Sequence, residues 1–427
     1  MNVKIRPFGG ALAAVLALST LAACGSSSST TGQDAGGKIG GTISVTSVDA
    51  HAKDVGAAFE KKYPGTTVKV QVVGDVSAIQ QQVRTQLTSK TAPDLFSVWP
   101  GNGNPTAVTV LGAAGDFMYD LSARPWVKQM SKRLVDSASY NGKVYDALYG
   151  VNGIGAIYNM DAMKSAGLTP PTTWSEVLGL CAAAKAKGTV AYALGAQDSW
   201  ITQLIPYALT STLVYGPDPQ FSAEQAAGKA TFTGSAWTKA YELYLQMQTS
   251  GCFNKDVLGT SYIDTQKLLA TGKALGAVNG NWMIAEVRKA NADATFTLYP
   301  FPATDDASKT YLPVAAGAGL AVNKYTKNLP TALAFADFYL SPEGLGIAVP
   351  IQGGLPPFPV DTVKPDASLE NIVSYLSKGL VSSFPDQGWP NAKVQAEHLS
   401  GAQEILGGKA SVADVLTKMQ TEFASKS

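Results

Sequence analysis

The sequence predicts an α/β protein of two lobes, in which each lobe is a mostly parallel β-sheet with covering helices. The length of 427 residues exceeds what one hydrophobic core usually holds, which favours two lobes. Short apolar runs alternate with segments of helical periodicity, as in parallel sheets whose strands are connected by helices. A glycine-rich apolar stretch, 150–158, is typical of a hinge crossing between lobes.

Composition and charge limit the partners of the chain. Hydrophobic residues make up 45% and charged residues 15%, which is typical of a globular protein. The formal net charge is only +1, so no broad basic field attracts nucleic acid or anionic lipid. We therefore expect no nucleic-acid partner, and a ligand that is neutral or weakly charged.

The first residues are typical of a targeting segment. Lys4 and Arg6 precede an apolar run, 11–21, which is too short to cross a membrane comfortably. It ends in Leu-Ala-Ala-Cys24, which resembles the lipobox of bacterial lipoproteins. We expect a signal peptide at 1–23, lipidation of Cys24 and a flexible Gly/Ser-rich tether at 24–41, which place the protein at the outer face of the cell membrane. Plain secretion is the alternative.

The first lobe is expected to comprise residues 42–149 and 302–342. Its beginning has a strand–helix–strand–helix–strand pattern, with the apolar positions Ile43–Thr46, Val55–Phe59, Val68–Val72, Ile79–Leu87 and Leu95–Trp99. Trp99 ends the third strand, and ligands of open α/β sheets bind at that edge. The segment 317–322 is expected to return to this sheet, followed by a helix over 331–339.

The second lobe is expected to comprise residues 150–301 and 343–427. Its expected strands are 190–194, 274–278 and 296–299, and its expected helices include 174–187 and the C-terminal segment. The first crossing lies within 140–174, where Asn159 opens a short helix ending at Gly167. A capping box at Thr173 and Glu176 starts the next helix. Pro300–Pro302 is expected to form a second crossing.

Cysteine and histidine are rare in the mature chain. Cys181 and Cys252 permit one disulfide, although the apolar stripe around Cys181 equally favours a buried free thiol. The two histidines and these cysteines have no metal-ligand spacing, so we expect no metal site and no cofactor.

Four of the seven tryptophans lie in turn-rich loops with a polar residue close by. The pairs are Trp99 with Asn102, Trp200 with Asp198, Trp282 with Asn281 and Trp389 with Gln387. A sugar ring has apolar faces and a rim of hydroxyls, so it requires aromatic platforms and hydrogen-bonding side chains. We predict these eight residues as ligand-binding, with Asp49 and His51 beyond the first strand as further candidates. The alternative is that a tryptophan in a loop packs into the hydrophobic core, as is often found.

Several segments, taken in order, resemble those of one family. They are FEKKYPGTTVKV, TAPDLFSVWPGNG, YNGKVY with IYNMDAMKSAGL and PTTWSEV, GKALGAVNGNW, AGAGLAVNKYTKN and SPEGLG. Together they are similar to extracellular solute-binding lipoproteins of the maltose-binding type, which serve ABC sugar importers. The resemblance implies a periplasmic-binding-protein-like fold (type II), a monomer, and a sugar enclosed by hinge closure before delivery to membrane permease subunits.

The resemblance also bears on single residues. Trp99 and Trp282 match family positions, and the loop of Trp389 matches a tryptophan-bearing loop of the maltose binder. Asn152 aligns with a position that often bonds sugar hydroxyls, although the maltose binder has a carboxylate there. The loop 100–105 carries asparagines where the maltose binder places charged residues. These amides favour a neutral di- or oligosaccharide.

Three other functions remain as alternatives. A glycoside hydrolase requires two carboxylates at the cleft, and Asp198 is the only acid expected beside a platform. A polyamine binder requires several acids, and an iron or peptide binder of the same fold requires other side chains. A structural or adhesive lipoprotein has no use for hinge-like crossings. We therefore expect a binding protein and not an enzyme.

Overall fold

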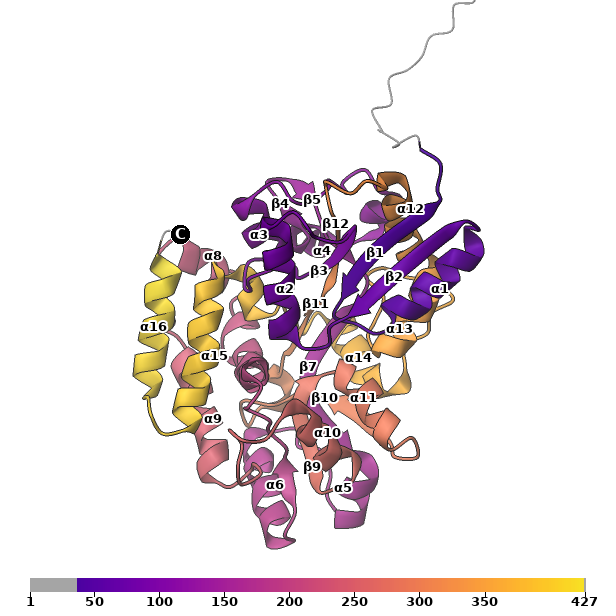
Figure 1. Ribbon diagram of the computed structural model, residues 1–427. Coiled ribbons are helices and arrows are strands. Elements are labelled where there is room, and N and C mark those ends of the chain that lie inside the picture. Colours follow the sequence, from indigo (N-terminus) through magenta and orange to yellow (C-terminus); the bar gives the residue numbers. More distant parts are fainter. Residues whose placement is uncertain (1–36, 426–427) are drawn as a thin grey trace, which may run out of the picture. The chain divides into compact units, whose positions relative to one another are not determined.

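The first sheet carries the N-terminal strands. In the computed structural model, which describes residues 37–425, its strand order is β2-β1-β3-β12-β6 (Figure 1). The strands are β1 (Gly41–Ser47), β2 (Thr66–Val72), β3 (Leu95–Val98), β6 (Ala147–Leu148) and β12 (Gly319–Val322). β1 is parallel to β2 and β3, whereas β12 is antiparallel to β3 and β6. We call this sheet with its helices the first lobe.

The second sheet is built around β7 (Val151–Asn159), all of whose residues are buried. Its strand order is β13-β11-β7-β9-β8, and β10 also pairs with β7. The other strands are β8 (Val190–Tyr192), β9 (Ala274–Gly280), β10 (Phe296–Tyr299), β11 (Leu312–Ala316) and β13 (Val381–Ser382). A separate two-stranded sheet joins β4 (Ser139–Tyr140) and β5 (Lys143–Val144). We call the second sheet with its helices the second lobe.

The two-lobe α/β fold with mostly parallel sheets is confirmed, because every described strand of the first sheet except β12, and every described strand of the second sheet except β7, runs in one direction. In the second sheet, β7 is antiparallel to β9, β10 and β11, and the described strand pairs β8–β9 and β11–β13 are parallel. Apolar periodicity identifies a strand but not its direction. Strands that cross from the other lobe, such as β7 and β12, enter a sheet at the edge where its parallel strands end. They are therefore antiparallel to their neighbours.

Helices cover both sheets (Figure 1). They are α1 (Ala52–Lys62), α2 (Val76–Thr88), α3 (Val108–Ala114), α4 (Lys132–Ser137), α5 (Met160–Ala166), α6 (Trp174–Ala186), α7 (Leu204–Thr210), α8 (Phe221–Ala226), α9 (Trp237–Thr249), α10 (Tyr262–Ala270), α11 (Trp282–Ala290), α12 (Leu329–Tyr339), α13 (Pro342–Gln352), α14 (Glu370–Lys378), α15 (Ala392–Leu406) and α16 (Val412–Ala424). Successive residues of β3 point to opposite faces of the first sheet. Leu95 belongs to the core cluster that includes Phe59 of α1, and Phe96 belongs to the cluster that includes Ile79 of α2.

Helix starts follow the sequence closely. Asn159 Oδ1 accepts a hydrogen bond from the Ala162 N–H (3.0 Å), and α5 stops at Gly167, whose φ is +66°. The predicted capping box at Thr173 and Glu176 is present at α6. These local signals are confirmed because they need only neighbouring backbone groups.

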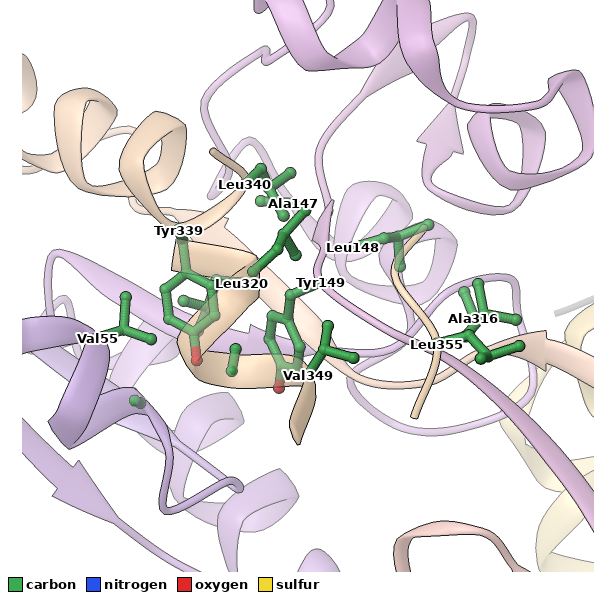
Figure 2. Close-up of a cluster of buried hydrophobic side chains, with 14 of the residues drawn as sticks. Val55, Ala147, Leu148, Tyr149, Ala316, Leu320, Tyr339, Leu340, Val349 and Leu355 are labelled. Carbon is green, nitrogen blue, oxygen red and sulfur yellow. The ribbon is translucent and has the colours of Figure 1, made fainter. Parts of the chain in front are cut away.

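The chain passes between the two sheets at residues 149–150 and again at residues 317–318. The first passage agrees with the predicted crossing. The second differs from the crossing expected at Pro300–Pro302, because β11 pairs with β7 and keeps residues 312–316 in the second sheet. Tyr149 of the first passage packs against Tyr339 of α12, with ring centroids 5.1 Å apart (Figure 2). The full lobe boundaries given above stay a prediction.

Cys181 of α6 and Cys252 form a disulfide, which decides between the two alternatives left open by the sequence. Both cysteines are fully buried in the core of the second lobe. The bond ties α6 to the segment that follows α9.

The segments at the N-terminus fall outside this description. The predicted signal peptide, Cys24 and most of the 24–41 tether precede residue 37, so they stay predictions. Within residues 37–425, no helix has both the length and the apolar character needed to cross a membrane.

Candidate functional site

A cavity of about 250 Å³ lies where the ligand-facing edges of the two sheets meet. The first lobe contributes residues beyond β1 and β3, including Asp49 and Trp99. The second lobe contributes residues at the start of β7 and beyond β8 and β9, including Asn152, Trp200 and Trp282. Because these strand ends share one edge of each sheet, residues far apart in sequence meet around one space.

Aromatic side chains form a large part of the wall. Trp99 lies on the first-lobe side, and Trp200, Trp282 and Tyr262 lie on the second-lobe side. The rings of Trp200 and Tyr262 are 4.9 Å apart and nearly perpendicular, and those of Trp200 and Trp282 are 6.4 Å apart. The group therefore presents apolar surfaces at several angles, as a sugar ring requires.

Amide side chains surround these rings. Asn104, Asn152, Gln80, Gln203, Gln352, Gln387 and Gln395 all line the cavity. Asn152 Oδ1 accepts a hydrogen bond from Asn281 Nδ2 (3.0 Å), and Asn104 Oδ1 accepts one from the Thr106 N–H (3.0 Å). Each bond leaves the amide nitrogen as a donor for a ligand acceptor.

Three carboxyl groups also line the cavity: Asp49, Glu286 and Asp386. Tyr262 Oη and Gln266 Nε2 both donate to Glu286 Oε2, at 2.5 and 2.6 Å. Burial raises the pKa of Glu286 despite the Tyr262 hydrogen bond, and burial raises the pKa of Asp386 to about 6. This contradicts the expectation that Asp198 is the only acid at the site.

Asp49 contacts two buried polar side chains, Tyr149 and His51. Tyr149 Oη donates to Asp49 Oδ2 (2.6 Å), and His51 Nε2 lies 3.6 Å from the same oxygen. Burial raises the pKa of Asp49, but the contacts with His51 and Tyr149 outweigh it and hold the pKa below its ordinary value. His51 is buried, is hydrogen-bonded to Tyr339 through Nδ1 (2.7 Å), and does not line the cavity. It positions Asp49 instead of facing a ligand.

Two other predicted ligand residues, Trp389 and Asn281, also do not line the cavity. Trp389 is fully buried among Tyr207, Phe232 and Trp237, so it plugs the second-lobe core. Asn281 is fully buried, accepts from the Gly153 N–H (2.6 Å) and donates to Gly353 O (2.6 Å), which joins three segments at the crossing. Both are corrections: each side chain is held in the interior by packing or hydrogen bonding.

Asp198 and Asn102 also lie away from this cavity. Asp198 Oδ2 accepts from the backbone N–H of Tyr262 (2.6 Å), so it holds the start of α10 and thereby the Tyr262 ring. Asn102 lines a different cavity of about 470 Å³, together with Arg133, Ser222 and Gln387. Gln387 lines both cavities.

The sequence analysis missed several lining residues, namely Asn104, Tyr262, Glu286, Gln352, Asp386 and Gln395. Glu286 follows Trp282 by four residues on α11, so helical spacing from a predicted platform could have identified it. Asn104 stands in the same loop as Asn102. Tyr262, Gln352 and Gln395 lie on helices with no local mark of a site.

Two glycines bring the lobes into backbone contact beside the cavity. A Cβ on Gly101, whose φ is +75°, would lie 2.5 Å from Gln387 O. A Cβ on Gly103 would lie 2.5 Å from both the Cβ and the backbone O of Asp386. The loop 100–104 of the first lobe therefore fits against the segment 385–388 only because these positions lack a side chain.

Comparisons with known proteins agree with this architecture. The model of the family described as "Bacterial extracellular solute-binding protein" matches residues 43–345. This chain belongs to that family, which consists of binding proteins and not enzymes, and the resemblance inferred from the sequence is confirmed.

The individual relatives have low sequence identity to this chain, between 20% and 25%. The "Multiple sugar-binding protein" of Streptococcus mutans is 25% identical over 302 residues, which cover 68% of each protein. The solved structure of RafE in complex with raffinose has a TM-score of 0.77 at 20% identity, covering 90% of this chain and 100% of that one. A sugar transporter from Bacillus licheniformis in complex with stachyose has a TM-score of 0.72 at 20% identity, covering 89% and 98%. These structures share the fold of the chain.

Proposed function

We propose that this protein captures a saccharide in the cavity between its lobes and delivers it to the membrane permease of an ABC importer. It acts as a monomer at the outer face of the cell membrane, held there by lipid on Cys24. Membership of an extracellular solute-binding family supports the capture role, and the names of the relatives, which mention sugar, raffinose and stachyose, support the ligand class.

One observation carries the saccharide assignment. Trp99, Trp200, Trp282 and Tyr262 surround a cavity whose remaining wall is rich in amides. Indole faces cover the apolar faces of a pyranose, and the amides bond its hydroxyls, each of which would cost about 1–3 kcal/mol if buried unpaired. Asn152, Gln387 and Asp49 supply such partners, together with Asn104, which the sequence analysis overlooked.

The small volume of the cavity favours a short ligand. This volume of about 250 Å³ is slightly below the range of about 300–1,000 Å³ that is usual for drug-sized ligands. We therefore propose that one or two sugar rings are enclosed, as a disaccharide or as the end of a longer chain. Capture without cleavage is part of the proposal, and incubation with labelled oligosaccharides should give no products.

A thermal-shift panel tests the ligand class. Mono-, di- and trisaccharides should raise the Tm selectively, because a ligand that binds only the folded state stabilises it by about 2.7 kcal/mol at one hundred times its Kd. Spermidine and a short peptide serve as non-saccharide solutes. A shift with spermidine or the peptide and with no saccharide would contradict the proposal.

Hinge closure is the proposed mechanism of capture. Ligand bound to one lobe favours the closed arrangement because the other lobe then adds contacts. Loop 100–104 and segment 385–388 are the backbone contact of that arrangement.

Replacing Gly103 by alanine should weaken saccharide binding about tenfold, because the new Cβ would collide with Asp386 and hold the lobes apart. Calorimetric titration measures the change. Gly74→Ala is the matched control, since a Cβ there meets no atom within 4 Å. Equal affinities of Gly103→Ala and the unmodified protein would show that this contact does not contribute to capture.

A further inference from the structure

We infer that the captured saccharide carries a protonated amine, and that this amine binds between Asp49 of the first lobe and Glu286 of the second. The inference rests on the proposed function and deepens it, because it names the class of saccharide. It also revises the expectation of a neutral ligand, which was drawn from the small net charge of the chain and from the asparagines of loop 100–105.

The cavity contains negative groups without positive ones. Asp49, Glu286 and Asp386 line it, whereas no Lys, Arg or His belongs to its described lining. The positive charges closest along the chain to Glu286 are Arg288, which is paired with Asp366, and Lys289, which is exposed. Both lie on the same helix as Glu286, and neither lines the cavity. Amides alone can bond the hydroxyls of a ligand, whereas each buried carboxylate adds a desolvation cost that a cation on the ligand offsets.

The acids have oxygens left for a ligand. Asp49 uses Oδ2 toward Tyr149 and His51, and Glu286 uses Oε2 toward Tyr262 and Gln266. Within residues 37–425, no protein group donates a hydrogen bond to the other oxygen of either carboxylate. Asp386 Oδ1 and Gln352 Oε1, on side chains that are at least nine-tenths buried and line the cavity, also have no hydrogen-bond partner. The lining therefore has more hydrogen-bond acceptors than donors. A ligand hydroxyl can donate to one of these acceptors, whereas an ammonium group has three N–H donors and can satisfy several of them.

The two carboxylates also oppose each other across the cleft. Burial is the main cause of the raised pKa of Glu286. The Tyr262 hydrogen bond and the charge of Lys289 lower this pKa, and the negative charge of Asp49 raises it further. Because Asp49 and Glu286 belong to different lobes, their repulsion grows as the lobes approach. A cation placed between them converts that repulsion into attraction, which couples closure to a ligand of positive charge. A uronic acid or a sugar phosphate would instead add a third negative charge.

The test uses matched saccharides that differ at one group. The β-1,4-linked disaccharides of glucosamine, of N-acetylglucosamine and of glucose are titrated into the purified protein at pH 7, with glucuronic acid as the anionic probe. The glucosamine disaccharide should bind at least tenfold more tightly than the other two disaccharides, and raising the salt concentration should weaken it selectively. Glucuronic acid should not bind.

Glu286→Gln provides the residue-level test. It keeps the shape of the side chain and removes its charge, so the tenfold preference for the amino form over the glucose form should disappear. Glu242→Gln, at an exposed position of α9 outside the cavity, should keep the preference. Comparing ratios of affinities separates the loss of charge recognition from a general loss of binding.

The outcomes distinguish this inference from the proposed function. If the glucose or N-acetylglucosamine disaccharide binds as tightly as the glucosamine form, the amine assignment is overturned while saccharide capture stands. If the preference survives in Glu286→Gln, the placement of the amine is overturned. If no saccharide of the thermal-shift panel or this set binds, the proposed function falls and the inference falls with it.

Discussion

Replacing Trp282 by alanine is expected to weaken saccharide binding more than tenfold while the protein still folds. Trp282 begins α11 directly after β9, and its indole lies beside Trp200 on the cavity wall. Removing it takes away apolar surface that would cover one face of a sugar ring. A tenfold loss corresponds to about 1.4 kcal/mol, which is within the contribution of one aromatic contact. Calorimetric titration with the saccharide that gives the largest thermal shift measures the effect.

Two variants make this result interpretable. Trp282→Phe keeps an aromatic face and should recover part of the affinity. Tyr325→Ala removes an aromatic ring that is 67% exposed and lies outside the cavity, so it should leave binding unchanged. Unchanged affinity in a folded Trp282→Ala protein would remove Trp282 from the site.

Removing the disulfide is expected to cause the largest loss of stability. Cys181 and Cys252 are separated by 71 residues, and a cross-link over a loop of that length stabilises the folded state by about 4 kcal/mol in the chain-entropy model. The double variant Cys181→Ala, Cys252→Ala should therefore unfold at lower urea concentration. Saccharide affinity should change little, because both cysteines lie in the second-lobe core and do not line the cavity.

Denaturant unfolding of the oxidised protein, the reduced protein and the double variant measures this effect. Reduction should lower the unfolding free energy of the unmodified protein toward that of the variant and should not affect the variant itself. A difference below about 0.5 kcal/mol between oxidised and reduced protein would contradict a stabilising cross-link.

The candidate site was only partly predictable from the sequence. Trp99, Trp200 and Trp282 were identified because each follows a strand, and sheet topology brings such positions to one edge. Trp389 has the same local pattern, but a tryptophan between turns also fits a core, and here Phe232 and Trp237 enclose it. The residues next to a tryptophan in the sequence do not show whether it lies on a cavity wall or in the core, because the surrounding side chains come from distant segments.

Two acids of the cavity, Glu286 and Asp386, were missed in the sequence for a related reason. Glu286 is one turn beyond Trp282, and Asp386 follows a proline in a 3₁₀ turn, so neither carries a mark of its own. Their importance arises from the cavity that they line together with Asp49, because only the tertiary structure brings these three residues around one space. The expected neutrality of the ligand depended on the small net charge of the chain and on loop 100–105, and neither shows which acids line the cavity.

The sequence by itself determined the two-lobe α/β architecture, the helix starts at Asn159 and Thr173, and the family of the chain. These features depend on short-range periodicity, on caps that need only adjacent backbone groups, and on the order of segments. Only the tertiary structure decided the strand directions around β7, the pairing of Cys181 with Cys252, and which polar side chains face the cavity. Each of these features depends on contacts between residues far apart in the chain. Such contacts contribute free energy only once the chain has folded and brought those residues together.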